Sequence, residues 1–421
     1  MDDVKHLEYD AVIIGGGPAG AATAAILAEK GRRVIILEKA KFPRYKIGES
    51  LIPYCYFPLE RLGMVEKLNQ SHFVDKHSVQ FVSKRGKVSQ PFYFYEHTKH
   101  PCAKTWQVLR SEFDVMMLDN ALEKGAEVLH ETAARELIHE GDQVVGVRAR
   151  GADGQQYELR APVTVDASGR ESFAVKAKGW RVDDPQLKKI AVWSYFRGAK
   201  RDPGMDEGAT TVAFVPEKGW FWYIPLPDDM VSVGVVAERD YLYRGERDPE
   251  AIYQREIDIQ PWIKQYTAVG ERAGDVQVTG DYSYRAKHCA SDGLVLVGDA
   301  FAFLDPVFSS GVFLALQSGV VAADTIDAAL KEGDVSAERF TDYGESMCQG
   351  LEAMRRLVYA FYDEGFSWAK LFEKYPHLRE DATDCLIGHL WKDFDPLFDA
   401  VSEFAEVPEP LPHGRPLVTV T

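Results

Sequence analysis

Short apolar runs and a helix-like stretch alternate in the first forty residues. Residues 9–14 are apolar and rich in β-branched side chains, which predicts a buried strand. A glycine-rich turn and an alanine-rich run to Lys30 follow, and Gly31 stands where a helix-ending glycine is expected. A second apolar run, 34–37, closes at Glu38. The pattern predicts a complete βαβ unit.

Alternation of apolar and polar residues indicates a different kind of sheet further along the chain. Residues 111–124 predict an amphipathic helix, and Asp153-Gly154 predicts the turn of a hairpin. Alternating strands of the middle region favour an antiparallel sheet with one covered face. The strands expected in this sheet are 192–196, 210–215, 221–226 and 231–237, while 144–150 and 157–160 are expected to form the hairpin and 163–166 a further short strand.

The last third of the chain is predominantly helical by pattern. A buried strand at 294–297 precedes Gly298, and a long helix is expected from about Gly311. Helical, aromatic-rich sequence continues from Ala337 to Pro408. Residues 408–421 include four prolines and predict a loosely held, flexible tail.

These elements together predict an α/β plus antiparallel β fold. A discontinuous Rossmann-like domain is expected from residues 1–82, 101–180 and 275–330. An inserted antiparallel, substrate-side sheet is expected from 83–100 and 181–274, and a C-terminal helical cap from 331–421.

Composition and charge exclude several classes of protein. The net charge of −16 repels nucleic acid and anionic membranes. The most apolar region, 293–321, contains Asp299, Asp305 and Pro306, so no membrane span is expected, and the N-terminal residues predict no secretory signal. Five separated cysteines without a C-x-x-C pair indicate a cytoplasmic protein with no metal site.

The glycine-rich turn has the context of a dinucleotide site. Gly15-x-Gly17-Pro18-Ala19-Gly20 lies between the predicted strand and helix, where glycines permit a tight turn and close approach of a pyrophosphate. The helix N-terminus favours the phosphates, and the Glu38 carboxylate suits a ribose hydroxyl pair. FAD and NAD both fit this pattern.

Three later segments favour a flavin. Asp299 follows a predicted strand and is suited to ribityl hydroxyls. The turn from Pro306 to Gly311 feeds a helix whose N–H groups suit an anion, and Arg110 suits polar groups of the cofactor.

In order and spacing, the segments from Asp10 to about Ala323 resemble the FAD-binding flavoprotein monooxygenase superfamily. The resemblance implies FAD as the cofactor. It also implies that FAD is bound by Gly15, Gly17, Pro18, Ala19, Gly20, Glu38, Lys39, Gly48, Glu49, Ser50, Arg110, Asp299, Pro306, Gly311 and Val312.

Two further motifs resemble flavin-dependent halogenases. Residues 42–53 resemble a segment that those enzymes share with geranylgeranyl-reductase-like proteins. Trp220-x-Trp222-x-Ile224-Pro225 matches the family's W-x-W-x-I-P pattern, and alternate residues of a strand share one face. The resemblance implies an aromatic barrier between a flavin site and a substrate site.

A third segment, residues 73–81, is similar to the one that carries the catalytic lysine of halogenases. Lys76 is the matching residue, although Ser78 replaces the usual glycine, and Lys46 is the second candidate. An ammonium in a confined pocket can polarise hypohalous acid or form a haloamine, whereas an isolated lysine is usually a solvated surface charge.

The segment around the predicted helix start narrows the substrate class. The resemblance places halide near Ser309, Ser310 and Gly311. Phe308 occupies the position of a glutamate in tryptophan halogenases, which indicates a phenol or pyrrole halogenase and leaves the general base unassigned.

The implied reaction uses reduced FAD, O2 and halide to halogenate an electron-rich aromatic ring, free or tethered to a carrier protein. No second G-x-G-x-x-G motif for a nicotinamide is present, which favours a separate flavin reductase as electron source. Two alternatives fit the same motifs: an FAD-dependent aromatic hydroxylase or geranylgeranyl-reductase-like oxidoreductase, and a flavin-binding accessory protein that matures a partner.

Overall fold

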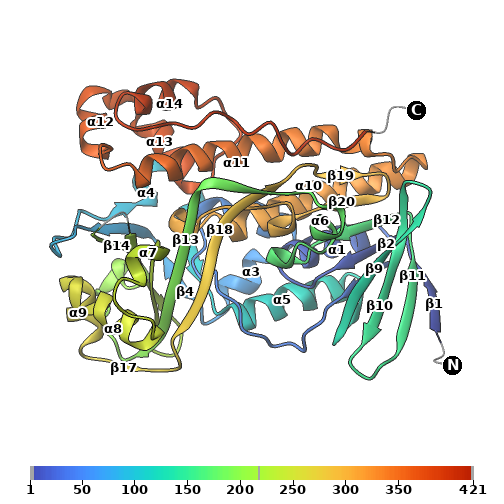
Figure 1. Ribbon diagram of the computed structural model, residues 1–421, viewed down its shortest axis with the longest axis horizontal. Coiled ribbons are helices and arrows are strands. Elements are labelled where there is room, and N and C mark those ends of the chain that lie inside the picture. Colours follow the sequence, from blue (N-terminus) through green and yellow to red (C-terminus); the bar gives the residue numbers. More distant parts are fainter. Residues whose placement is uncertain (1–3, 217–218, 419–421) are drawn as a thin grey trace.

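A six-stranded sheet forms the centre of the nucleotide-binding part of the protein (Figure 1). The computed structural model describes residues 4–216 and 219–418. Five neighbouring strands of the sheet, β20, β12, β2, β3 and β8, run parallel to one another. The first four of these are fully buried, which agrees with their uninterrupted apolar sequences. Four of these strands are confirmed to within two residues of their predicted bounds. The strand order is β19 (Ala290–Ser291), β20 (Leu294–Leu296), β12 (Val163–Asp166), β2 (Ala11–Ile14), β3 (Val34–Leu37) and β8 (Glu127–Leu129).

Three helices pack beside this sheet: α1 (Pro18–Glu29), α5 (Arg110–Glu123) and α10 (Gly311–Glu332). Small residues let α1 and α10 approach closely, since a Cβ atom at Gly319 would lie 2.6 Å from the Ala19 carbonyl oxygen. Helix α10 is long and apolar enough to span a membrane, but 67% of its most apolar 18-residue stretch is buried inside the protein. That burial is typical of a core helix.

A four-stranded sheet lies beside the six-stranded sheet. It confirms the predicted hairpin, because β10 and β11 pair antiparallel. The strand order is β1 (Val4–Glu8), β11 (Gln156–Arg160), β10 (Gln143–Gly151) and β9 (Thr132–Glu140).

The third large sheet has nine strands and corrects two expectations. Its central strands pair antiparallel as predicted, but β14 pairs parallel with β5, so the sheet is mixed. The expected domain boundaries also cut through it, because β5, β18 and β21 fall within residues assigned to the nucleotide-binding domain. Strand pairing between distant segments produces both differences. The members are β21 (Ala302–Phe303), β18 (Gln277–Ala286), β13 (Arg181–Arg197), β16 (Met230–Glu238), β15 (Gly219–Leu226), β14 (Thr210–Val215), β5 (Ser78–Val82) and β6 (Phe92–Tyr93), with β17 (Glu271–Arg272) paired to β13.

Helices cover the outer face of this sheet and connect its strands. Of the segment 83–100, only β6 is a described strand that enters the sheet, and α4 follows it directly. Strands β4 and β7 form a separate two-stranded ladder that carries Lys76. The remaining elements are α2 (Tyr56–Arg61), α3 (Val65–Asn69), β4 (Val74–Lys76), α4 (Phe94–His97), β7 (Thr105–Gln107), α6 (Phe173–Lys178), α7 (Arg239–Leu242), α8 (Pro249–Ile259) and α9 (Pro261–Thr267).

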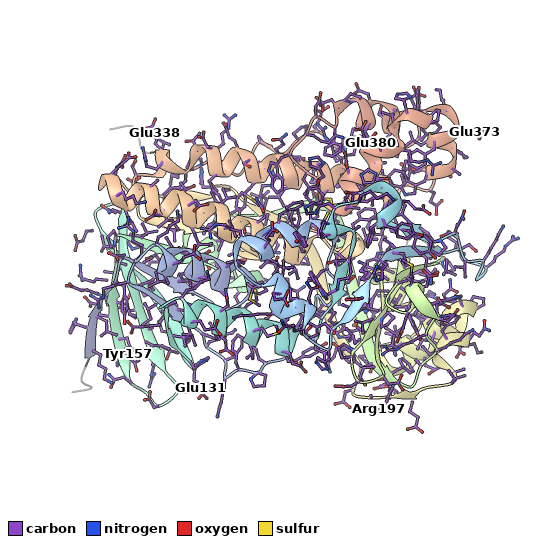
Figure 2. All side chains as sticks on the ribbon, turned by 180° about the vertical axis from the view of Figure 1, so that it is seen from behind. Glu131, Tyr157, Arg197, Glu338, Glu373 and Glu380 are labelled. Carbon is purple, nitrogen blue, oxygen red and sulfur yellow. The ribbon has the colours of Figure 1, made fainter. Side chains whose placement is uncertain are left out.

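The C-terminal region forms a helical layer along one side of the molecule (orange to red in Figure 1). It consists of α11 (Thr341–Tyr362), α12 (Trp368–Lys374), α13 (Arg379–Ile387) and α14 (Asp395–Ser402). Glu373 and Glu380, both exposed, belong to this layer and are labelled in Figure 2. The predicted loosely held tail is wrong for the described residues up to 418. Gly414 N–H donates to the Lys287 carbonyl at 2.9 Å and Leu417 N–H to the Ala290 carbonyl at 2.8 Å, so non-proline residues dock this segment.

We predict that Gly20→Ala destabilises the protein. The added Cβ atom would lie 2.0 Å from the Gly15 carbonyl oxygen, and this backbone cannot move without opening the contact between β2 and α1. Overpacking of this kind lowers the free energy of unfolding by about 1–3 kcal/mol. Gly16→Ala is the matched control, because its Cβ atom would make only contacts of 3.4 Å or longer. Equal unfolding midpoints for the two variants in urea would contradict the prediction.

Candidate active site

The turn between β2 and α1 is held by backbone contacts that only glycine permits. Gly15 has a φ of +107°, and a Cβ atom there would lie 2.4 Å from the Ala167 carbonyl oxygen. Helix α1 begins at Pro18 with Gly17 as its N-cap, and no acidic residue occupies its first turn. The free N–H groups and positive end of the helix therefore fit a pyrophosphate.

A cavity of about 750 Å³ connects this turn to the nine-stranded sheet. Every residue predicted to contact the cofactor lines it, with the exception of Gly20, which packs against Gly15 instead. Sequence reasoning missed a second set of lining residues, most of which lie in segments without a recognised motif; Arg44 falls within the motif segment 42–53 but was given no role there. This set includes Arg44, Thr132, Ala133, Ala134, Arg170, Thr210, Val212, Thr279 and Phe303.

Glu38 stands at the end of β3, where a ribose of a dinucleotide is expected. One carboxylate oxygen accepts the Gly16 N–H at 3.0 Å, and the other accepts the Ala40 N–H at 2.9 Å. Arg44 lies 3.7 Å from the same carboxylate. These contacts fix Glu38 at the cavity wall with its charge partly balanced.

Arg110 is the first residue of α5 and is held in one geometry. Its guanidinium binds both oxygens of Asp114, at 2.8 and 3.0 Å, and donates to the Ile47 carbonyl at 2.7 Å. Gly48 has a φ of +106°, and a Cβ atom there would lie 2.8 Å from Arg110. Only glycine therefore fits at position 48, where the backbone passes close to the Arg110 guanidinium.

Asp299 follows β20 and reaches the same cavity from the opposite segment. Burial raises the pKa of its carboxyl to about 6, although Arg170, Arg110 and Lys46 each lower it. A carboxyl at a strand end is suited to hydrogen bonds with cofactor hydroxyls. The structure thus brings together Gly15, Glu38, Arg110 and Asp299 from four distant segments.

Strand β15 forms an aromatic wall of this cavity. Trp220, Trp222 and Ile224 share one face and line it, whereas Pro225 points away. Trp220 donates to the Tyr362 hydroxyl at 2.8 Å, and Trp222 donates to the Ser232 hydroxyl at 3.0 Å. The two indoles are therefore fixed in orientation.

Close packing behind the wall requires a glycine in the neighbouring strand. A Cβ atom at Gly234 would lie 2.2 Å from the Trp222 ring, and Trp193 packs against that ring at 6.2 Å between centroids. The two indoles therefore form a tightly packed wall of the cavity.

Glu49 is a buried carboxyl of the same cavity. The Tyr195 hydroxyl donates to it at 2.6 Å and lies 2.9 Å from the Tyr45 hydroxyl. Burial raises the Glu49 pKa to about 7, and the hydrogen bond from Tyr195 only partly offsets this effect. A pKa in this range suits the Glu49 carboxyl to exchange a proton near neutral pH.

The predicted halide segment lies where α10 begins. Ser309 and Gly311 line the cavity, and Ser309 adopts a left-handed conformation with φ +56°. Ser310 is buried as the residue before the helix and does not reach the cavity. Phe308 packs edge-on against Phe361 with 5.6 Å between ring centroids.

Lys76 is buried on β4 and does not line the flavin-sized cavity. Its ammonium nitrogen donates to the Ser50 hydroxyl at 2.8 Å and to the Leu51 carbonyl at 2.9 Å. The Phe94 ring covers it at 5.8 Å. Burial lowers the Lys76 pKa to about 7, with a small opposing effect of Cys55.

Lys46, the second candidate, lies on the flavin side and is exposed. Because Lys76 lies outside the cavity, it fits a catalytic lysine held apart from the flavin better than Lys46 does. Among residues 4–216 and 219–418, no group of three or more metal-ligating side chains is found.

The comparisons with known proteins agree with this site. A family model described as FAD binding domain matches residues 8–353. The chain is 36% identical over 329 residues to the 1H-pyrrole-2-carbonyl-(peptidyl-carrier protein) brominase of Pseudoalteromonas luteoviolacea, covering 77% of this chain and 79% of the relative. It is 29% identical over 407 residues to the corresponding chlorinase of Pseudomonas fluorescens, covering 91% and 90%. The solved structure of flavin-dependent brominase Bmp2 matches with a TM-score of 0.86 and 30% identity, covering 94% of this chain and 99% of that one.

Fold and site together define an FAD-binding enzyme of the monooxygenase-like class. Within that class, the chain belongs to the flavin-dependent halogenase family. FAD is its cofactor, and the glycine turn, Glu38, Arg110 and Asp299 fit the parts of a dinucleotide. The predictions of family, cofactor and enzyme class are confirmed.

We predict that Glu49→Gln makes the stability of the FAD-free protein less dependent on pH. A carboxyl whose pKa rises from 4.5 unfolded to about 7 folded stabilises the protein fully below pH 4.5 and loses that contribution as pH rises through 7. Wild type should lose about 2–3 kcal/mol more than Glu49→Gln between pH 5 and 8.

Urea unfolding at both pH values measures this difference. Glu373→Gln is the control, since Glu373 is an exposed residue of the helical layer (Figure 2). Parallel pH dependences for wild type and Glu49→Gln would show that Glu49 does not titrate as proposed.

Proposed function

We propose that this enzyme halogenates an electron-rich pyrrole or phenol ring by way of hypohalous acid and Lys76. The carrying observation is that Lys76 is buried outside the flavin cavity and hydrogen-bonds to Ser50, a residue that lines the cavity. The fixed indoles of Trp220 and Trp222 line the same cavity, and we propose that they keep a bulky arene from the flavin while a small oxidant reaches Lys76. Burial lowers the pKa of Lys76 to about 7, which suits its amine to react with hypohalous acid.

FAD, once reduced, supplies the oxidising chemistry with O2 in the cavity. The protein orients the cofactor through the α1 N-terminus and Arg110, and the segment at Ser309 and Gly311 is suited to hold a halide near it. Ser50 and Thr210 form the part of the cavity nearest to Lys76. Lys76 then holds hypohalous acid for the aromatic substrate.

The substrate class is supported by relatives and by Phe308. The relatives from Pseudoalteromonas and Pseudomonas act on a pyrrole-2-carbonyl group attached to a peptidyl carrier protein, so a carrier-tethered pyrrole is the first substrate to test. Phe308 is apolar and packed against Phe361, which leaves no carboxylate at this position for free tryptophan chemistry. A separate reductase is proposed as the source of reduced FAD.

The deciding experiment supplies purified protein with FAD, a flavin reductase, O2 and either bromide or chloride. Carrier-bound pyrrole, free pyrroles and phenols are then screened by mass spectrometry. Halogen isotope doublets are expected. Hydroxylated products, or NAD(P)H oxidation that needs no reductase and responds to substrate, would overturn the proposal.

We predict that Lys76→Ala lowers halogenation by about 100-fold or more, as for loss of a group acting in proton or halogen transfer. Lys76→Met is made in parallel because it retains the buried side-chain volume. Lys84→Ala, which removes an exposed lysine, is the control and should leave the rate unchanged. Full activity of both Lys76 variants would contradict the proposed role of Lys76 in halogen transfer.

A further inference from the structure

We propose that the hydroxyls of Ser50 and Thr210 form a proton relay that joins Lys76 to the flavin cavity. This inference rests on the proposed function of Lys76 and adds two residues to it. Ser50 and Thr210 come from distant segments, and their oxygens lie 2.8 Å apart. Both side chains are buried, and both line the cavity that Lys76 does not reach.

The hydrogen bonds give this chain of groups a direction. Lys76 donates to the Ser50 oxygen at 2.8 Å, and the Gln107 amide donates to the Thr210 oxygen at 2.8 Å. Gln107 is fixed in turn by the Gly208 carbonyl at 2.8 Å. With both oxygens already accepting, Ser50 can donate to Thr210 while Thr210 donates into the cavity.

Lys76 has few other routes for a proton. Its second bond is to the Leu51 carbonyl, which cannot release a proton, and the Phe94 ring lies over it. Among the described residues, Ser50 is the only side chain that hydrogen-bonds to it. Cys55 is the titratable group that affects its pKa, while the neighbouring Asp75 pairs with Lys104 at 3.0 Å.

The proton step balances without any further reactant. The Lys76 ammonium gives one proton to Ser50, Ser50 gives its own to Thr210, and Thr210 gives its own to a hypohalite ion in the cavity. The products are hypohalous acid, which is the better electrophile, and a neutral amine whose lone pair is free. Each hydroxyl ends with one proton, so no oxidant or reductant is consumed.

Titration of Lys76 provides the first test and needs no turnover. NMR of protein carrying ¹³C-labelled lysine follows the Lys76 signal against pH, with Lys76→Met for assignment. Ser50→Ala should lower the midpoint by about one pH unit, because the ammonium loses an acceptor. Ser50→Thr keeps the hydroxyl and should restore the midpoint. An unchanged midpoint in Ser50→Ala would overturn the contact on which the relay depends.

Halogenation by the FAD-loaded enzyme provides the second test. Thr210→Val should leave the Lys76 midpoint within a few tenths of a unit yet lower halogenation about tenfold, with more unused hypohalite released to a scavenger. The matched control is Thr211→Val on the same strand, whose hydroxyl accepts instead from Gln80 at 2.8 Å. Equal rates and equal release in the two variants would overturn the relay.

The outcomes separate this inference from the proposed function. If wild type halogenates no arene, the proposed function fails, while the titration still reports on the Ser50 contact. If wild type halogenates and Ser50→Ala and Thr210→Val behave like Thr211→Val, the relay alone fails. A loss of rate in Thr210→Val beyond any loss of thermal stability, compared with Thr211→Val, supports it.

Discussion

Trp220 and Trp222 stand on one face of β15, and their fixed positions form one wall of the flavin cavity. Neither indole can swing aside, because Tyr362 and Ser232 hold their nitrogens and Gly234 admits the Trp222 ring into the neighbouring strand. In the proposed function, this wall keeps an arene from the flavin, and the small oxidant reaches Lys76 past Ser50 and Thr210.

The pKa shifts of Lys76 and Glu49 follow from burial of their side chains and not from the net negative charge of the chain. Burial shifts the pKa of Lys76 downwards and the pKa of Glu49 upwards, each to about 7, because water is excluded from both charged forms. Glu49 and Ser50 are adjacent in sequence, and Ser50 contacts Lys76. One short segment therefore presents an acid to the flavin cavity and supports an amine behind it.

Much of the cofactor site was predictable from sequence, because it is built on local rules. The glycine turn, Glu38 and the strand before Asp299 depend on tight turns and on uninterrupted apolar runs, which can be recognised within one segment. The parallel pairing of β14 with β5 joins residues more than a hundred positions apart and leaves no local pattern. Thr210 was missed for the same reason, since its partners Ser50 and Gln107 lie in other segments. The docked tail was mispredicted because its hydrogen bonds come from a few non-proline residues, Gly414 and Leu417 among them.

The helical layer at the C-terminus is part of the site and not only a cover over it. Tyr362, the last residue of α11, accepts a hydrogen bond from Trp220 and donates to Asp305 at 2.9 Å. Asp305 in turn accepts the Val307 N–H at 3.1 Å in the turn that leads to Ser309. A single tyrosine hydroxyl therefore links the aromatic wall to the proposed halide segment. A change in how α11 packs would alter the aromatic wall and the start of α10 together, so the wall and the proposed halide segment are physically coupled through this contact.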